Sequence, residues 1–187
     1  ISTGSATVSQ INDVLQCLEN EGVKDFALLK CTSEYPALPE DIHLKTIPHM
    51  KETFKCVVGL SDHTMGIGVP VASVAFGAKI IEKHFTLDKS MEGPDHKASL
   101  EPQELKLMIE SIRNTEKALG SSKKKSSPSE SVNIDAARKS IVARTDIKKG
   151  DILDGSNLSV KRPESGMSPM KWDEICGSIA VKNYQED

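Results

Sequence analysis

Apolar residues recur at intervals of three and four along several stretches of the chain, a spacing that predicts amphipathic helices. The first stretch runs from Ser5 to Gly22, where Thr7 or Ser9 can cap the start. The last and longest covers about Pro102 to Leu119 and ends before a glycine. The apolar positions of the four predicted helices are Val8, Ile11, Leu15 and Leu18; Leu44, Ile47, Met50 and Phe54; Val71, Val74 and Ala75; and Leu105, Met108, Ile109 and Ile112.

Short apolar runs between these helices predict buried strands at Asp25–Lys30 (DFALLK), Cys56–Leu60 (CVVGL) and Lys79–Lys83 (KIIEK). The opening residues, ISTG, look like the end of a further strand. Strands that alternate with helices at a period of about 25 to 30 residues indicate parallel βαβ units. Because no glycine-rich dinucleotide motif follows any strand, a barrel fits better than a doubly wound sheet. Four strands are half of a closed barrel, so we expect the chain to begin in mid-domain without the N-terminal half.

A change of composition after the last helix predicts a second domain. Residues 121–133 (SSKKKSSPSESVN) are rich in Ser and Lys and lack apolar periodicity, which is typical of a solvated linker rather than a binding patch. Strand-like pieces follow at Ser140–Arg144 and Asn157–Pro163, separated by KKGD and DGSN turns. We therefore divide the chain into a partial barrel (1–120), a linker (121–135) and a small β-rich domain (136–187), and leave open whether the last domain is truncated.

Composition and charge limit the classes of binding partner that the sequence leads us to expect. The 187 residues carry a net charge of −3, and the charges alternate in sign, so neither nucleic acid nor a membrane surface is an expected partner. No apolar run approaches the roughly 20 residues that span a bilayer, and no signal sequence is visible. The four cysteines match no zinc or disulfide framework, which favours reduced thiols in the cytoplasm.

Two histidines stand at the carboxyl ends of neighbouring predicted strands, where parallel α/β proteins carry their active sites. His63 follows the CVVGL strand and His84 follows the KIIEK strand. Adjacent strands lie about 4.8 Å apart, so both imidazoles can be aimed at one point. An imidazole pair favours a transition metal such as Mn, Fe or Zn over Mg. The alternative is a pair of hydrogen-bonding histidines.

A loop after the last strand carries a further candidate. Gly93-Pro94 fixes a turn in MEGPDHKASLEP that can present Asp95 over the strand ends, where it could bind a hydroxylated substrate. The alternative is an Asx turn or a helix cap. His96 and Lys97 receive no role.

Taken together, GLSDHTMGI, IIEKHFTLD and GPDHKASLEP, with ISTG and LKCTSEYP, resemble the sialic acid synthases. IKKGD and LSVKRP resemble the antifreeze-like (SAF) domain that ends those enzymes. The resemblance implies the C-terminal half of a TIM barrel followed by a β-clip SAF domain. It also implies condensation of phosphoenolpyruvate with an N-acetylated aminosugar, such as N-acetylmannosamine, to give a nine-carbon 2-keto acid and phosphate.

The resemblance further implies roles for individual residues. His63 and His84 would bind the catalytic metal, with Mn²⁺ first and Mg²⁺ or Co²⁺ as alternatives. The phosphate-binding lysines are expected in the missing half. The remaining implied substrate contacts are Ser2, Ser33 and Ser61 to phosphoenolpyruvate, Tyr35 and Asp95 to the sugar, and Arg162 to the N-acetyl group.

Arg162 would reach the barrel of a partner subunit, which implies a domain-swapped homodimer. Without the resemblance it reads as a surface arginine on an edge strand. This chain has the sequence CTS where many members of that family have a sequence similar to CTN. The Ser33 side chain is shorter than asparagine, so its expected contact reaches less far than theirs.

Three other readings stay open. The chain could be an inactive fragment or a sugar-binding module, since the sequence pattern shows only four of the eight strands that a closed barrel needs. The second domain could be an ice-binding protein. Within the enzyme class, legionaminate and pseudaminate synthases are alternatives to a neuraminate synthase, and GPDHKAS looks more like the neuraminate and legionaminate branches.

Overall fold

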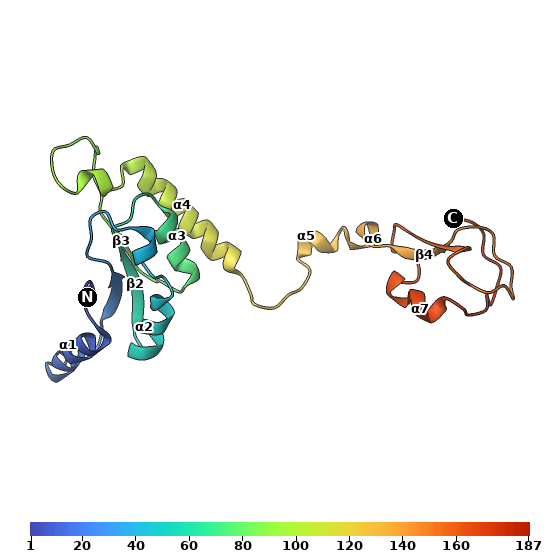
Figure 1. Cartoon of the computed structure of the whole chain (residues 1–187), viewed down its shortest axis with the longest axis horizontal. Coiled ribbons are helices and arrows are strands. Elements are labelled where there is room, and N and C mark those ends of the chain that lie inside the picture. Colours follow the sequence, from blue (N-terminus) through green and yellow to red (C-terminus); the bar gives the residue numbers. More distant parts are fainter. The chain divides into compact units, whose positions relative to one another are not determined.

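The computed structural model describes residues 1–187 as two compact units, Ile1–Ser121 and Ser122–Asp187 (Figure 1). Each unit has its own hydrophobic core. The boundary lies at the start of the Ser- and Lys-rich stretch, where no apolar periodicity holds the chain to either core.

A parallel sheet forms the centre of the first unit, with strand order β1-β2-β3. The strands are β1 (Ala27–Cys31), β2 (Val57–Asp62) and β3 (Ile81–Lys83). Single parallel bridges extend the sheet at both edges, from Ser2 to Leu29 and from Phe85 to Leu100. The predicted βαβ order is therefore confirmed, although the ISTG segment contributes one bridge rather than a full strand.

Helices alternate with these strands along the chain: α1 (Val8–Asn20), α2 (Thr46–Phe54), α3 (Gly68–Ala75) and α4 (Pro102–Leu119). Helix α1 begins at a capping box formed by Thr7 and Gln10. Helices α3 and α4 lie side by side (Figure 1). Two short 3-10 helices, η1 (Pro39–Asp41) and η2 (His96–Ala98), lie in the loops that follow β1 and β3.

One face of the sheet forms the core with the helices. Strand side chains alternate between faces, and Leu28, Val58 and Leu60 are buried in one cluster with Ile11 of α1 and with the α2 side chains. Each fully buried aliphatic side chain contributes roughly 1.5–3 kcal/mol. The remaining buried members of the cluster are Ala37, Ile42, Ile47, Met50 and Ala78.

The opposite face of the sheet contains a close approach between strands at Gly59. A Cβ at this position would lie 2.4 Å from the carbonyl oxygen of Ile80 and 2.6 Å from the Leu29 side chain. Only glycine fits there without movement of the neighbouring backbone. The register that this contact allows sets Asp62 opposite Lys83 at the strand ends.

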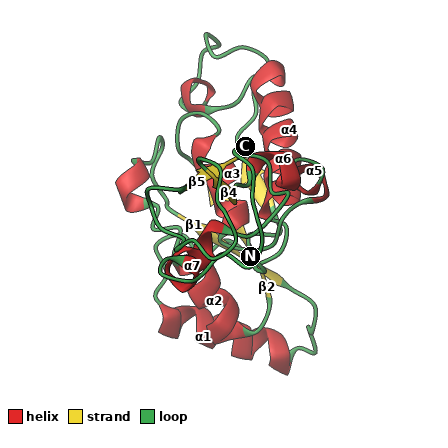
Figure 2. Ribbon diagram, turned by 90° about the vertical axis from the view of Figure 1, so that its right-hand side faces the viewer, coloured by secondary structure: helices red, strands yellow, loops and turns green.

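The second unit is mostly loop, with short elements (Figures 1 and 2). Its antiparallel strands β4 (Ser140–Ala143) and β5 (Leu158–Lys161) confirm the predicted strand-like pieces. Ile147, Leu158 and Ala180 form its buried core. The unit also contains α5 (Pro128–Ser131), α6 (Ile134–Ala137), η3 (Pro169–Lys171) and α7 (Trp172–Ile175).

The stretch predicted as a solvated linker contains two short helices after Ser127. Ser127 and Glu130 form a capping box that starts α5 at Pro128, and α6 follows directly. The Ser-rich composition concealed this local signal. Among all the helices, none combines the length and apolar character needed to cross a membrane.

Candidate active site

Two imidazole rings meet beyond the carboxyl ends of β2 and β3. Asp62 and Lys83 are paired as the last residues of the two strands, so the residues that follow them, His63 and His84, are neighbours. Their ring centroids lie 5.2 Å apart with an interplanar angle of 89°. The predicted convergence of the two histidines is confirmed, while their role as metal ligands stays a prediction.

The His63 ring has a fixed orientation. Its Nδ1 lies 2.8 Å from the carbonyl oxygen of Thr32, and because a carbonyl only accepts, Nδ1 carries the proton and donates. The lone pair is then left on Nε2. A histidine that binds a metal through one nitrogen commonly donates its other N–H to a backbone carbonyl or carboxylate. The ring is also largely buried, since His63 is only 8% exposed.

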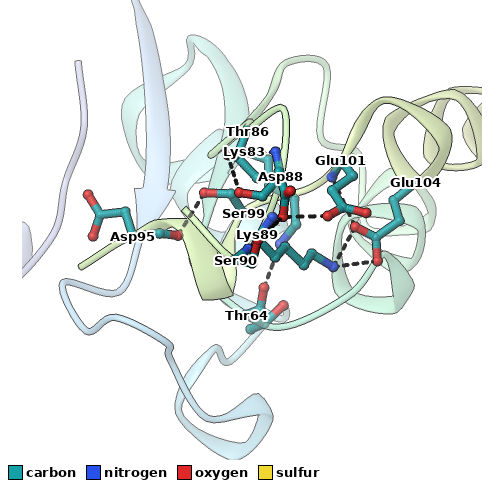
Figure 3. Close-up of polar contacts among 10 residues, drawn as sticks. All are labelled: Thr64, Lys83, Thr86, Asp88, Lys89, Ser90, Asp95, Ser99, Glu101 and Glu104. Atoms are coloured by element: carbon teal, nitrogen blue, oxygen red, sulfur yellow. Dashed lines mark hydrogen bonds and ion pairs between the residues drawn. The ribbon is translucent and has the colours of Figure 1, made fainter. Parts of the chain in front are cut away.

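Asp95 faces the second imidazole. Its Oδ2 lies 3.8 Å from His84 Nδ1, and the two side chains are half and one-third exposed. The backbone carbonyl of Asp95, not its carboxylate, accepts from the Ser99 hydroxyl, and the side chain makes no capping hydrogen bond (Figure 3). The Asx-turn or cap alternative is therefore wrong, and the carboxylate is available to a ligand.

Several contacts hold the loop that carries Asp95 (Figure 3). The backbone N–H of Lys89 donates to Glu101 Oε1 at 3.0 Å, and its Nζ donates to Glu104 Oε1 at 2.6 Å. The hydrogen bond from Lys89 lowers the pKa of Glu104. His96, to which the sequence assigned no role, is hydrogen-bonded to the Thr86 hydroxyl at 2.7 Å. These contacts join the loop to Thr86, shortly after β3, and to the start of α4.

Tyr35 stands against both histidines. Its ring centroid is 4.1 Å from that of His63 and 5.4 Å from that of His84. More than half of the residue, 54%, is exposed. The structure therefore brings together four of the predicted site residues: Tyr35, His63, His84 and Asp95.

The predicted serine contacts are in different environments. Ser61 is buried, and its hydroxyl donates to Glu82 Oε1 at 2.7 Å. Ser33 is exposed, and its hydroxyl occupies the space beside Gly4, at the end of the ISTG segment that also carries Ser2. Sequence reasoning missed Glu82. The signal was a charged residue in the apolar KIIEK run, opposite Ser61 in the register.

The structure places Lys30, Asp62 and Lys83 together as a buried charged cluster near the ends of the three strands. Burial lowers the pKa of Lys30, while Cys31 and Asp62 oppose that shift. Each lysine donates to protein groups of the strand ends. The phosphate-binding lysines were expected outside this chain, and the position of these two buried lysines at the strand ends was not predicted.

The donor set is suitable for a divalent metal. No group of three or more His, Cys, Asp or Glu side chains converges on one point, so this chain offers two imidazoles and leaves the other coordination positions open. Catalytic metal sites keep such open positions for water or substrate oxygen. With Nδ1 of His63 engaged, Nε2 is the nitrogen that fits this role.

Arg162 lies in the second unit, directly after β5. It is exposed, and its Nε donates to the carbonyl oxygen of Ala137 at 2.7 Å. That bond leaves the two terminal nitrogens of the guanidinium available. Its predicted role with a partner subunit stays a prediction.

A parallel sheet with helices on one face and polar side chains gathered beyond its carboxyl ends defines an α/β protein of the barrel class. The chain belongs to the NeuB family, whose model matches residues 1–124. The SAF domain model matches residues 138–187. The predicted resemblance and fold class are thereby confirmed.

Named relatives agree with this assignment. The chain is 52% identical to the N,N'-diacetyllegionaminic acid synthase of Campylobacter jejuni, over 100% of this chain and 57% of that protein. It is 42% identical to a pseudaminic acid synthase of the same species, over 99% and 54%. The crystal structure of an N-acetylneuraminic acid synthetase from Leptospira borgpetersenii superposes with a TM-score of 0.64 at 36% identity, over 71% and 46%. The chain thus spans about half the length of these relatives.

Proposed function

We propose that this chain forms part of an enzyme that condenses phosphoenolpyruvate with an N-acetylated aminosugar to give a nonulosonic acid and phosphate. The observation that carries the proposal is the His63–His84 pair, with Nε2 of His63 free and with Tyr35 and Asp95 beside the rings. The names of the relatives support the same reaction class.

His63 and His84 would hold a divalent metal, with Mn²⁺ as first choice. When bound, such a metal polarises the aldehyde of the open-chain sugar as a Lewis acid. Tyr35 and Asp95 orient the sugar, since a half-exposed carboxylate accepts hydrogen bonds from hydroxyls. The π electrons of the C2–C3 double bond of phosphoenolpyruvate then form a bond from C3 to the aldehyde carbon, and the C=O π bond of the aldehyde breaks to leave a hydroxyl there. Water adds at the electron-poor C2, one of its protons goes to the former aldehyde oxygen and the other to phosphate, and the C2–O bond to phosphate breaks, which leaves the 2-keto acid.

Ser2, Ser33 and Ser61 are proposed to contact phosphoenolpyruvate as neutral hydrogen-bond donors. For Ser61 this requires its hydroxyl to turn away from Glu82. We also propose a cytoplasmic location and a homodimer in which Arg162 enters the partner's site. The four free cysteines support a reducing compartment.

The sugar is the open part of the proposal. The higher identity to the legionaminic acid synthase favours the diacetamido sugar that leads to legionaminic acid over the one that leads to pseudaminic acid, and N-acetylmannosamine is the second candidate. A substrate panel on the full-length protein with Mn²⁺, scored by phosphate release and product mass, tests this. Release with one N-acetylated sugar and a matching product mass is expected. No release with any member of the panel would defeat the synthase assignment and favour an inactive or sugar-binding module.

Replacement of Asp95 by Asn should weaken sugar binding. The substitution keeps the shape of the side chain and removes the charge that accepts from sugar hydroxyls, so we expect KM for the sugar to rise about 10-fold to 100-fold. KM for phosphoenolpyruvate should stay within about twofold. Steady-state kinetics with each substrate varied in turn measure both. Glu92→Gln, in the same loop, is the control; equal effects of the two variants on the sugar would refute the role.

Replacement of Arg162 by Ala tests the second unit. Loss of the guanidinium should raise KM for the N-acetylated sugar about tenfold while the sedimentation coefficient of the dimer stays unchanged. Exposed Arg144 of the same unit provides the control Arg144→Ala. A monomeric wild-type protein, or an Arg162→Ala variant with normal sugar KM, would remove the swapped-dimer proposal.

A further inference from the structure

Asp62 and Lys83 form an ion pair sealed from solvent, with side chains that are 0% and 2% exposed. Asp62 follows Val58 and Leu60 at intervals of two, so it points to the same side of β2 as these core residues. Removal of such charges from water costs several kcal/mol per ion, and a buried ion pair is often no more stabilising than apolar residues of similar volume. A contribution to stability therefore does not by itself explain why this ion pair is present.

The contacts of the pair enclose one residue. Asp62 Oδ1 accepts from the backbone N–H of Thr64 at 3.2 Å and from its hydroxyl at 2.9 Å. Lys83 Nζ donates to Asp62 Oδ2. The same Nζ donates, at 2.6 Å, to the carbonyl oxygen of Thr64 (Figure 3). Lys83, Asp62 and Thr64, called here the strand-end clamp, thus fix the backbone on both sides of His63.

The neighbouring strand holds the other partner of His63. The carbonyl oxygen of Thr32 accepts from Nδ1, and Lys30 Nζ donates to the Thr32 hydroxyl at 2.6 Å. The carbonyl oxygen of His63 in turn accepts from the Ala37 backbone at 2.9 Å. The acceptor, the Thr32 carbonyl oxygen, lies on a different strand and does not depend on the strand-end clamp. Loss of the clamp would therefore loosen the donor, the His63 ring, and leave the acceptor in place.

We infer that Lys83 is a positioning residue, which through Asp62 and Thr64 holds His63 as the single tautomer that points its Nε2 lone pair toward the site. Lys83 touches no reacting atom in this role. The inference rests on the proposed function in one respect, the identity of the metal that Nε2 would bind. The orientation of the ring is a property of the metal-free protein and can be measured without a metal.

The first measurement is ¹⁵N NMR of the His63 imidazole in the metal-free full-length protein at about pH 8, where an ordinary imidazole is neutral. Wild type should show one tautomer, with the proton on Nδ1. Lys83→Met should show exchange between two tautomers. Asp62→Asn/Lys83→Met removes both charges and keeps an acceptor for Thr64, so it serves if the single variant, with its unpaired carboxylate, fails to fold. Lys79→Met, an exposed lysine just before β3, is the matched control and should match wild type.

The second measurement is Mn²⁺ affinity by titration of the EPR signal. The two clamp variants should bind about 10-fold to 100-fold more weakly than wild type and Lys79→Met. A wild-type protein that binds no Mn²⁺ while the tautomer still changes would defeat the proposed metal site and leave the clamp standing. A clamp variant, folded by circular dichroism, that keeps the single Nδ1–H tautomer would overturn the clamp whatever the metal result. A wild-type His63 with the proton on Nε2 would overturn it too.

Discussion

Replacing His63 or His84 by Ala is expected to abolish stoichiometric Mn²⁺ binding in the full-length protein and to lower kcat/KM at least about 1000-fold. Each imidazole would supply one of the two ligands that this chain provides, and the ring centroids are only 5.2 Å apart. Either replacement leaves one of the two imidazole ligands that this chain offers. Metal content after gel filtration and initial rates of phosphate release measure the two effects.

The control for this prediction is His49→Ala, because His49 is exposed on α2, away from the strand ends. It should retain wild-type Mn²⁺ content and rate. Circular dichroism establishes that the variants are folded. If both His63→Ala and His84→Ala keep one Mn²⁺ per chain, the metal assignment is wrong.

Replacing Gly59 by Val is expected to destabilise the first unit by about 3 kcal/mol and to reduce the yield of folded protein. The added carbon would start 2.4 Å from the Ile80 carbonyl oxygen, and a backbone atom cannot turn aside as a side chain can. The strands would have to separate where the register sets Asp62 opposite Lys83. Urea unfolding followed by circular dichroism gives the free energy of unfolding.

Gly68→Ala is the matched control, since a Cβ there meets nothing within 4 Å and the residue starts α3. Alanine favours a helix over glycine by up to about 1 kcal/mol, so this variant should be as stable as wild type or slightly more stable. A Gly59→Val variant that unfolds at the same urea concentration as wild type would contradict the close approach of β2 and β3.

The sequence was sufficient to predict those parts of the site whose positions depend only on the order of the strands. Because parallel strands end at one edge of a sheet, the positions of His63 and His84 after two apolar runs sufficed to place them together. The bounds of β3 were less predictable. The KIIEK run predicts five residues, but only Ile81–Lys83 are paired as a strand, since pairing depends on the neighbouring strand as well as on the run itself.

Contacts between charged residues of different strands could not be predicted in the same way. Alternation shows that Lys30, Asp62 and Lys83 share a face with apolar residues, but it does not show which groups they bind. The same holds for the Ser61–Glu82 hydrogen bond. The orientation of Asp95 depends on a loop held by contacts to α4 and Thr86, which lie outside any local pattern.

In the second unit, by contrast, the start of α5 could have been predicted from local sequence. Ser127 and Glu130 satisfy the capping-box spacing, and Pro128 occupies the first helical position. The low-complexity composition around them concealed this start of a helix.

We propose that the imidazoles of His63 and His84 together bind one divalent metal. Electron spin-echo envelope modulation of Mn²⁺ bound to the full-length protein counts the coordinating histidine nitrogens directly, and ¹⁵N-labelled histidine identifies them. The predicted result is modulation from two imidazole nitrogens in wild type and from one in His84→Asn at saturating Mn²⁺, because the amide oxygen of asparagine, unlike alanine, can still bind the metal. Modulation from fewer than two nitrogens in wild type, or an unchanged pattern in His84→Asn, would contradict it.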